Sequence, residues 1–284
     1  NTLNFIIKGD IMNVIKKHII CAGLMLACGA HAHAQTTNTP ETIDLYTKSA
    51  EAGNVEAQVN LANAYFEGDG VVKDAQKGFE LAMKAAKAGH ASAQYRVGGA
   101  YRTGEGVTAD LNQAVAWTQK SADQGYDFAY QSMGVYTYNG EGGLTKDFKA
   151  AFDWFKKGAD MGVDNSQVSA GYAYENGEGV ELDYGKAMAM YQKAADQGNA
   201  IAMRNIAFLY FNGNGTKQSD KNAFIWWFKA AEKGDSVSQN AVGWAYATGR
   251  GAAKDLNKAK QWYRKAVDQG NAQAQNGLAN LLRK

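Results

Sequence analysis

The sequence predicts an all-α protein, a right-handed superhelical α/α solenoid built from helix–turn–helix repeats. A Gly-x-Gly turn recurs six times, beginning at Gly68, Gly104, Gly140, Gly177, Gly213 and Gly249. Successive turns are 36, 36, 37, 36 and 36 residues apart, and such a fixed period is typical of solenoid proteins. The chain contains 32 glycines but only one proline, which favours many turns between uninterrupted helices. A second glycine series keeps the same period, at Gly53, Gly89, Gly125, Gly162, Gly198, Gly234 and Gly270.

The first helix of each repeat is indicated by an apolar stripe that precedes the turn. In segment 91–103 (ASAQYRVGGAYRT) this stripe has helical spacing. It consists of Ala93, Val97, Ala100 and Tyr101. Gly98 allows close contact with a neighbouring helix. Gly104 ends the segment, because a left-handed backbone costs glycine little.

The second helix of each repeat is expected to begin after an aspartate. Asp110 suits the N-cap position, since its carboxylate accepts hydrogen bonds from free backbone N–H groups. Equivalent residues are Asp74, Asp147, Asp183 and Asp255. The helix after Asp110 should end at Gly125 and bury Leu111, Ala114, Trp117 and Ala122. The Gly-x-Gly turn is therefore interpreted as a corner between helices, and the alternative is a loop that cradles an anion.

The repeat period divides residues 39–284 into units. We expect a half-unit at 39–56, full units at 57–92, 93–128, 129–165, 166–201, 202–237 and 238–273, and a half-unit at 274–284. Pro40 suits a first helical turn, where its missing N–H has no partner to lose. The last half-unit carries Leu278, Leu281 and Leu282, which must face an apolar surface.

Residues 12–34 have the pattern of a secretory leader, followed by a short linker at 35–38. The basic start MNVIKK precedes the apolar run HIICAGLMLACGA, and the small residues Ala32 and Ala34 suit cleavage after Ala34. Residues 1–11 are not expected in the native mature chain. The apolar run is too short to span a bilayer, so we expect a periplasmic or secreted protein with no transmembrane segment. The alternative is a lipoprotein anchored at Cys28.

Cleavage would also remove most of the reactive side chains. Both cysteines and three of the four histidines precede Gln35, so the mature chain would keep only His90 and no thiol. Loss of Lys8, Lys16, Lys17 and Asp10 takes the formal net charge from +2 to zero. A neutral chain argues against nucleic acid as a partner.

A lysine recurs five residues before each glycine of the second series. These lysines are Lys48, Lys84, Lys120, Lys157, Lys193, Lys229 and Lys265. An acidic residue follows three positions later in all repeats except that of Lys84, where Lys87 stands instead. We expect the lysines to complement the C-terminal ends of helices and to be neutralised by these acids, rather than to form a basic stripe.

One unit, residues 238–271 (SQNAVGWAYATGRGAAKDLNKAKQWYRKAVDQGN), carries a known pattern. Its matching positions are Gly243, Tyr246, Gly249, Gly251, Asp255, Lys258, Ala259, Trp262, Tyr263, Lys265, Gly270 and Asn271. This pattern resembles the Sel-1-like repeat, a relative of the tetratricopeptide repeat, and the resemblance runs from about Leu45 to Leu282. Local departures are Thr137, Ser166, Ser238 and Asn222. The resemblance implies a non-enzymatic protein that binds other proteins, and we expect a monomer.

In the related tetratricopeptide repeat, the first helices line a concave groove. By register, the corresponding positions here are Phe66, Tyr95, Arg102, Phe128, Tyr138, Asn139, Tyr172, Asn176, Arg204, Phe208, Phe211, Asn212 and Trp244. Aromatic side chains suit a bound protein or peptide, because they bury a large area with little loss of entropy. The alternative is that these rings only pack between adjacent first helices.

An envelope hydrolase is the alternative function. Glu105, Glu141 and Glu178 stand in the middle of three turns, and pairs of carboxylates can act as acid and base in glycoside hydrolysis. Every candidate acid follows the repeat, however, so the sequence favours a protein with no catalytic residue, metal or cofactor. His90 has no second histidine with which to build a metal site, and we expect it to complete a helix end.

Overall fold

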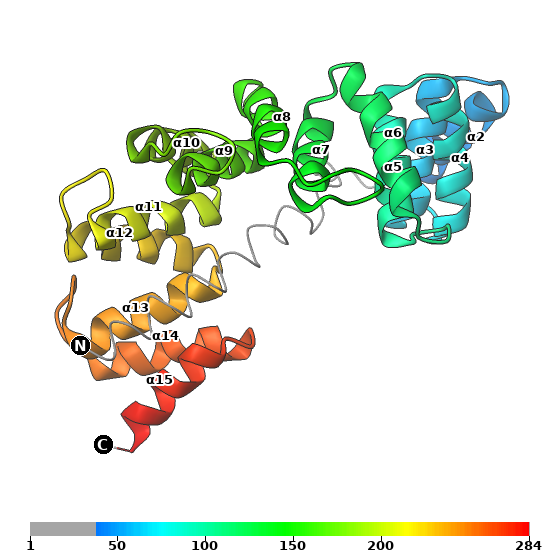
Figure 1. The fold of residues 1–284 in the computed structure, drawn as a ribbon. Helices are drawn as coiled ribbons and strands as arrows, with labels where there is room; N and C mark the ends of the chain where they lie inside the picture. The colour runs from blue at the N-terminus through cyan, green and yellow to red at the C-terminus, as the bar shows by residue number, and fades with distance from the viewer. Residues whose placement is uncertain (1–37, 284) are drawn as a thin grey trace. The chain divides into compact units, whose positions relative to one another are not determined.

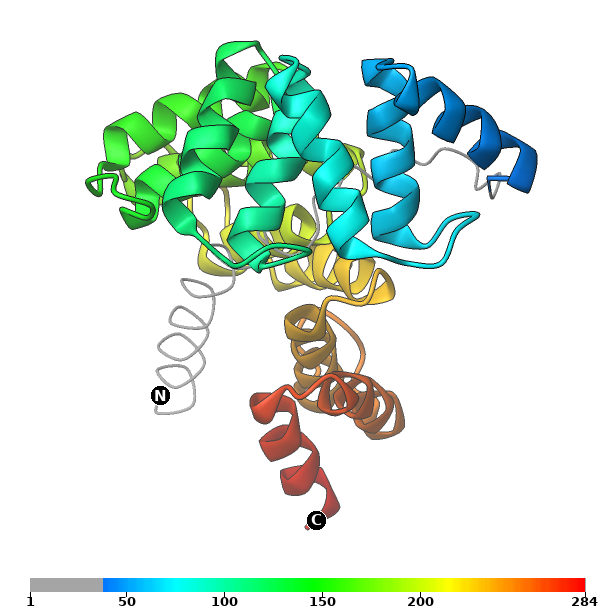
Figure 2. The ribbon, with the colours of Figure 1, turned by 90° about the vertical axis from the view of Figure 1, so that its right-hand side faces the viewer.

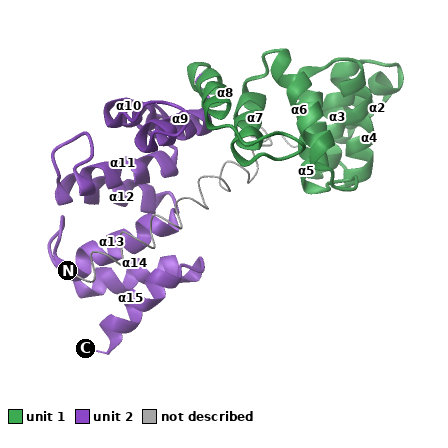
Figure 3. Ribbon diagram, viewed as in Figure 1, with its two compact units in different colours: residues 1–161 green, residues 162–284 purple. Residues whose placement is uncertain are grey.

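The computed structural model describes residues 38–283, which form fourteen α-helices and no strand (Figure 1). The predicted all-α solenoid of helix–turn–helix repeats is thereby confirmed. The chain divides into two compact units, unit 1 at residues 1–161 and unit 2 at residues 162–284 (Figure 3). The predicted leader lies outside the described residues.

Seven helices make up the described part of unit 1. They are α2 (Pro40–Glu51), α3 (Val55–Glu67), α4 (Ala75–Lys87), α5 (Ala91–Thr103), α6 (Leu111–Asp123), α7 (Asp127–Asn139) and α8 (Phe148–Asp160). Each packs against the next along the chain. Figure 2 shows this stack, from α2 in blue through α7 in green.

Unit 2 repeats the arrangement with seven further helices. They are α9 (Asp164–Asn176), α10 (Tyr184–Asp196), α11 (Ala200–Asn212), α12 (Asp220–Glu232), α13 (Ser236–Thr248), α14 (Leu256–Asp268) and α15 (Ala272–Leu282). Every helix from α3 to α14 has 13 residues. The last helix, α15, packs against α13 and α14. Leu278 and Leu281 thereby reach the core around Tyr263, whereas Leu282 is exposed.

Capping residues set the ends of the helices as the sequence indicates. Asp110 accepts hydrogen bonds from the backbone N–H groups of Asn112 and Gln113, at 2.9 and 3.1 Å. The other four predicted aspartates cap α4, α8, α10 and α14 in the same way. At the opposite end of α5, Gly104 has a left-handed backbone with φ of 77°. The predicted helix 91–103 therefore has the bounds of α5.

The Gly-x-Gly turn is a packed corner. The N–H groups of Gly104 and Glu105 both donate to the carbonyl of Ala100, so they are not directed at an anion. The second glycine, Gly106, lies so close to the carbonyl of Ala75 that an added Cβ would collide with it. Gly70, Gly142, Gly215 and Gly251 likewise lie against the start of the second helix of the preceding repeat. The corner interpretation is confirmed.

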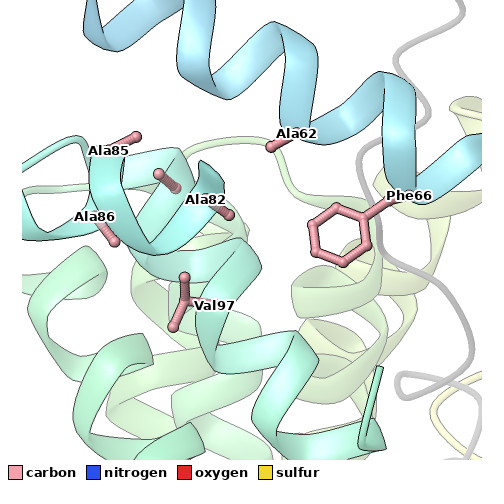
Figure 4. Close-up of a cluster of buried hydrophobic side chains, with 7 residues drawn as sticks. Ala62, Phe66, Ala82, Ala85, Ala86 and Val97 are labelled. Atoms are coloured by element: carbon pink, nitrogen blue, oxygen red, sulfur yellow. The ribbon is translucent and has the colours of Figure 1, made fainter. Parts of the chain in front are cut away.

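Alanine dominates the buried core, as the cluster around Phe66 illustrates (Figure 4). Small side chains let helices approach closely, and helical glycines then admit whole rings between them. The Phe66 ring lies against Gly78, and the Tyr191 ring lies against Gly171. Gly98 allows close contact between helices as predicted, because it lies against Ala114 and Thr118 of α6.

Hydrogen bonds between glutamines, which were not anticipated and which we call the glutamine ladder, join the two helices within each of three repeats, from an exposed donor to a buried acceptor. The amide of Gln124 donates to the side-chain oxygen of Gln94 at 2.7 Å. The same bond recurs in unit 2, from Gln197 to Gln167 at 2.9 Å and from Gln269 to Gln239 at 2.8 Å. The partners stand 30 residues apart, a spacing that differs from the 36-residue period.

One local expectation is wrong, and a second holds for the position of the residue but not for its side chain. Leu111 is 43% exposed rather than buried, because it occupies the first position of α6, before the helix has turned its apolar face inward. His90 precedes α5 at the N-cap position, but its side chain makes no capping hydrogen bond. Its ring Nε2 lies 3.1 Å from Glu56 Oε2 instead, so it connects α3 to the start of α5.

Candidate protein-binding face

The thirteen candidate residues fall in both units. Unit 1 contains Phe66, Tyr95, Arg102, Phe128, Tyr138 and Asn139, and unit 2 contains Tyr172, Asn176, Arg204, Phe208, Phe211, Asn212 and Trp244. Each unit is therefore considered by itself as a binding surface.

Three of the candidates are buried, namely Phe66, Tyr172 and Arg204. Phe66 belongs to the core of unit 1, and the guanidinium of Arg96 lies 3.5 Å above its ring. Phe66, Tyr172 and Arg204 were expected on an open surface, and their burial shows that this expectation is wrong. A position on the first helix does not guarantee exposure, because neighbouring helices cover part of that face.

Unit 1 holds a run of aromatic contacts. The ring centroids of Tyr95 and Tyr126 lie 5.4 Å apart, and those of Tyr126 and Phe128 lie 5.8 Å apart. Tyr126 precedes α7 at its N-cap position and was not anticipated. Tyr138 lies 4.9 Å from Phe148. Contacts within the units 93–128 and 129–165 thus engage these rings.

The polar candidates hold local structure. Arg102 lies over the ring of Tyr136 at 5.4 Å. The amide of Asn139 donates to Glu141 Oε1 at 2.7 Å, and that of Asn176 donates to the carbonyl of Tyr172 at 2.9 Å. Asn212 is exposed at the end of α11.

In unit 2 the structure brings three candidates together. Phe211 lies 5.6 Å from Trp244, with the rings edge to face. Phe208 and Phe211 both contact the buried ring of Trp227, at 5.6 and 5.2 Å. Phe208, Phe211 and Trp244 remain half-buried, and we call these three rings the aromatic face.

Arg250 completes the aromatic face and was not among the candidates. Its guanidinium lies 5.2 Å from the ring of Phe211 and 5.1 Å from that of Trp244. Nε and Nη2 of Arg250 hold the carboxylate of Asp220 at 2.8 and 2.9 Å. One signal was available in the sequence, since Arg250 is the only basic residue in the middle of a Gly-x-Gly turn.

Arg204 lies one helical turn before Phe208 on α11. Its Nη1 donates to Asp235 Oδ2 at 2.8 Å, and both side chains are at most 10% exposed. Asp235 also caps α13, where its Oδ1 accepts the N–H of Ser238 at 2.7 Å. Nε and Nη2 of Arg204 are buried and have no hydrogen-bond partner.

Seven Sel1 repeats match the chain, at residues 23–54, 55–90, 91–126, 128–163, 165–199, 200–235 and 236–271. The chain belongs to the Sel1 repeat family. The matched repeats from residue 55 onward begin one or two residues before the units that the sequence analysis delimits. Proteins of Sel1 repeats generally mediate protein–protein interactions and are generally not enzymes.

Solved structures of Sel1 repeat proteins agree. A protective antigen of uropathogenic Escherichia coli with this fold is 34% identical, with a TM-score of 0.76 over 84% of this chain. The match covers 51% of that antigen, so the present chain spans about half of its length. A Sel1 repeat protein of Oxalobacter formigenes is 30% identical, with a TM-score of 0.75 over 81% of this chain and 94% of the other. No curated protein is found to match.

In four of these Sel1 repeats the recurring lysine lies over a tryptophan three residues earlier. Nζ lies 4.0 to 4.4 Å from the ring centroid in the pairs Lys120–Trp117, Lys157–Trp154, Lys229–Trp226 and Lys265–Trp262. Within residues 38–283, none of the six lysines with an acid three positions later forms the expected ion pair with it. That expectation is wrong, because helical side chains lean toward the N-terminus and so toward the preceding turn.

The loop carboxylates are tied to neighbouring residues. Glu105 accepts a hydrogen bond from Arg96 at 2.8 Å, and Lys73 lies 3.9 Å away. Glu141 accepts from Asn139, as described above. These acids hold the turns against adjacent elements, so the contacts favour a structural role over a hydrolase.

One carboxyl group of the Sel1 repeats departs from the pattern. Glu175 of α9 stands where Phe211 stands in α11, and Tyr191 Oη donates to its Oε2 at 2.7 Å. Burial raises the pKa of Glu175, and the hydrogen bond from Tyr191 partly offsets this rise. Burial and the nearby Glu175 raise the pKa of Tyr191 well above its ordinary value. The raised pKa of Glu175 therefore follows from its burial.

No helix among residues 38–283 has the length and apolar character that crossing a membrane requires.

Proposed function

We propose that the chain binds a protein or peptide partner through the aromatic face of unit 2, as a non-enzymatic scaffold, regulator or toxin-neutralising protein of the bacterial envelope. The observation that supports this best is the cluster of Phe208, Phe211 and Trp244, which stays half-buried over a core that includes the buried Trp227. Interface energy concentrates in aromatic and arginine side chains, and Arg250 lies against two of these rings.

The cluster is also held in place by further contacts. Phe208 and Phe211 lie three residues apart on one helix, and both rest on the buried Trp227. Arg250 is held by two hydrogen bonds to Asp220. Side chains fixed in this way lose little entropy when a partner binds, which favours tight recognition.

The test is capture of a partner from the envelope and secreted fractions of the source bacterium, with the full chain as bait. The double variant Phe208→Ala/Trp244→Ala should lose the partner, with affinity reduced by about thirtyfold or more, since central aromatic residues typically contribute at least ~2 kcal/mol. The matched control is Ile225→Ala, an exposed apolar residue of α12 outside the aromatic face. Equal loss in control and double variant would contradict the proposal.

An envelope location for this role rests on the leader pattern of residues 12–34. Cleavage after Ala34 would leave a mature chain that begins at Gln35, periplasmic or secreted, whereas modification at Cys28 would anchor a lipoprotein. The intact mass of protein purified from the bacterium separates the two. A mass that still includes residues 12–34 would contradict both.

A further inference from the structure

Asparagine stands directly before glycine at five places in the chain. These pairs are Asn139–Gly140, Asn176–Gly177, Asn212–Gly213, Asn214–Gly215 and Asn276–Gly277. An asparagine in this position can lose its side-chain amide spontaneously, because glycine has no side chain to keep its backbone nitrogen away from the asparagine Cγ. The reaction requires a glycine nitrogen that holds no hydrogen bond and an asparagine side chain that is able to turn toward it.

Four of the five glycines have an N–H group that is held by a helix. Gly140, Gly177 and Gly213 end α7, α9 and α11, and the N–H of each donates to the carbonyl four residues earlier. Gly277 lies inside α15, where backbone N–H groups donate to carbonyls one turn earlier. Each of these nitrogens has to give up a hydrogen bond before it can attack a side chain.

The pair Asn214–Gly215 lies outside any helix, in the turn between α11 and α12. Within the part of the chain that the structure describes, neither the N–H of Gly215 nor the side chain of Asn214 has a hydrogen-bond partner. Gly215 is exposed, so water reaches the reacting atoms. Among residues 38–283, this is therefore the one Asn–Gly pair in which both groups are free to react.

We propose that Asn214 is a site of spontaneous deamidation. The nitrogen of Gly215 forms a bond to Cγ of Asn214, and its proton leaves with the side-chain amide as ammonia, which gives a cyclic imide. Water then opens the imide at one of its two carbonyl groups. Opening at Cγ leaves aspartate in a normal backbone, whereas opening at the backbone carbonyl leaves isoaspartate, in which the chain runs through Cγ. Either product replaces a neutral amide by a carboxylate.

The two products differ in how they fit the turn. Four sister turns carry an acid at the equivalent position, so aspartate suits this turn; these acids are Asp69, Glu105, Glu141 and Glu178. Isoaspartate lengthens the backbone directly before Gly215. That glycine already lies so close to Tyr184, at the start of α10, that an added Cβ would collide with the Cβ of the tyrosine. The longer backbone should therefore disturb this contact and destabilise unit 2.

The test incubates the native full chain at mildly alkaline pH and follows all five pairs by peptide mass spectrometry. Trypsin releases residues 205–217 as one peptide, and fragment ions separate Asn212 from Asn214. Asn214 should deamidate at least about fivefold faster than Asn212, because the nitrogen of Gly213 has to give up its hydrogen bond first. A urea-unfolded sample is the control, and there the five pairs should react at similar rates.

Two variants assign the products. Asn214→Gln should abolish the mass change, because a longer side chain disfavours closure of the imide ring. Asn214→Asp represents the aspartate product, and aged native chain that contains isoaspartate should unfold at a lower temperature than this variant.

Three results would overturn the inference. In the native chain Asn214 could react no faster than Asn212, or it could react only in the urea-unfolded sample, which would mean that the turn protects it. A mass change that persists in Asn214→Gln would assign the reaction to another residue. Aged chain that contains isoaspartate and unfolds at the same temperature as Asn214→Asp would contradict the expected loss of the contact with Tyr184.

Discussion

Tyr191 donates its hydroxyl hydrogen to the carboxylate of Glu175 at 2.7 Å, inside unit 2. The first lies on α10 and is fully buried, and the second lies on α9. Asn205 of α11 also contacts the hydroxyl of Tyr191. This polar group interrupts a core that is otherwise mostly apolar, and its protonation state bears on stability.

Glu175→Gln should change how the stability of unit 2 depends on pH. Burial raises the folded-state pKa of Glu175 above its ordinary 4.5. The stabilising contribution of the protonated acid is therefore complete below pH 4.5 and is lost as pH rises through the folded-state pKa. The amide cannot ionise, so the variant should gain stability relative to the native chain across this interval.

Urea unfolding of both proteins between pH 4.5 and about 8 measures this difference, and Glu232→Gln, an exposed position of α12, is the control. A difference in unfolding free energy that stays constant with pH would refute the prediction.

Tyr191→Phe removes the hydrogen bond that lowers the pKa of Glu175 and should lower the unfolding free energy by about 1–3 kcal/mol.

Gly251→Ala should destabilise unit 2 more than Gly270→Ala does. Both glycines have φ of 80°, so both substitutions carry the same left-handed strain, of about 1–2 kcal/mol. A Cβ on Gly251 would also meet the carbonyl of Asp220, whereas one on Gly270 has nothing within 4 Å. We expect this contact to add about 1–3 kcal/mol, measured by chemical denaturation. Equal losses would mean that the turn does not need its close approach.

Adjacent glycines of α5 should respond in opposite directions to alanine. Gly99 has open space around it, so Gly99→Ala should stabilise unit 1 by about 0.5–1 kcal/mol through helix propensity. Gly98→Ala should destabilise it by about 1–3 kcal/mol, because the methyl group would meet Thr118 and the carbonyl of Ala114. Thermal unfolding of the two variants checks the signs, and stabilisation by Gly98→Ala would show that α5 and α6 do not pack as described.

Gln269→Ala should weaken the glutamine ladder in unit 2. The substitution removes the donor to Gln239, which is 5% exposed, and leaves a buried oxygen without that partner. A loss of about 1 kcal/mol is expected in denaturant unfolding. Gln261→Ala, at an exposed position of α14, provides the comparison and should change stability by less than about 0.5 kcal/mol. Equal effects of the two substitutions would assign the ladder no stabilising role.

Much of the fold could be predicted because it depends on local chemistry. The cap at Asp110 and the left-handed Gly104 follow from backbone groups within a few residues, so the bounds of α5 and the start of α6 could be inferred. Leu111 was misassigned because burial at the first turn of a helix depends on what packs against it. The lysine–tryptophan contacts were missed because charge alone suggested the neighbouring acids as partners.

The sequence by itself determined the repeat period, the helix ends and the Sel1 family, since each follows from short-range spacing of glycine, aspartate and aromatic residues. Only the tertiary structure decided which of the thirteen candidates are accessible. In the tertiary structure Phe66 is buried, and Phe208 and Trp244 pack around Trp227. One edge of the Arg204 guanidinium has no hydrogen-bond acceptor. Register gives the side of the helix on which a side chain starts, whereas exposure and hydrogen bonding depend on the neighbouring helices that reach it.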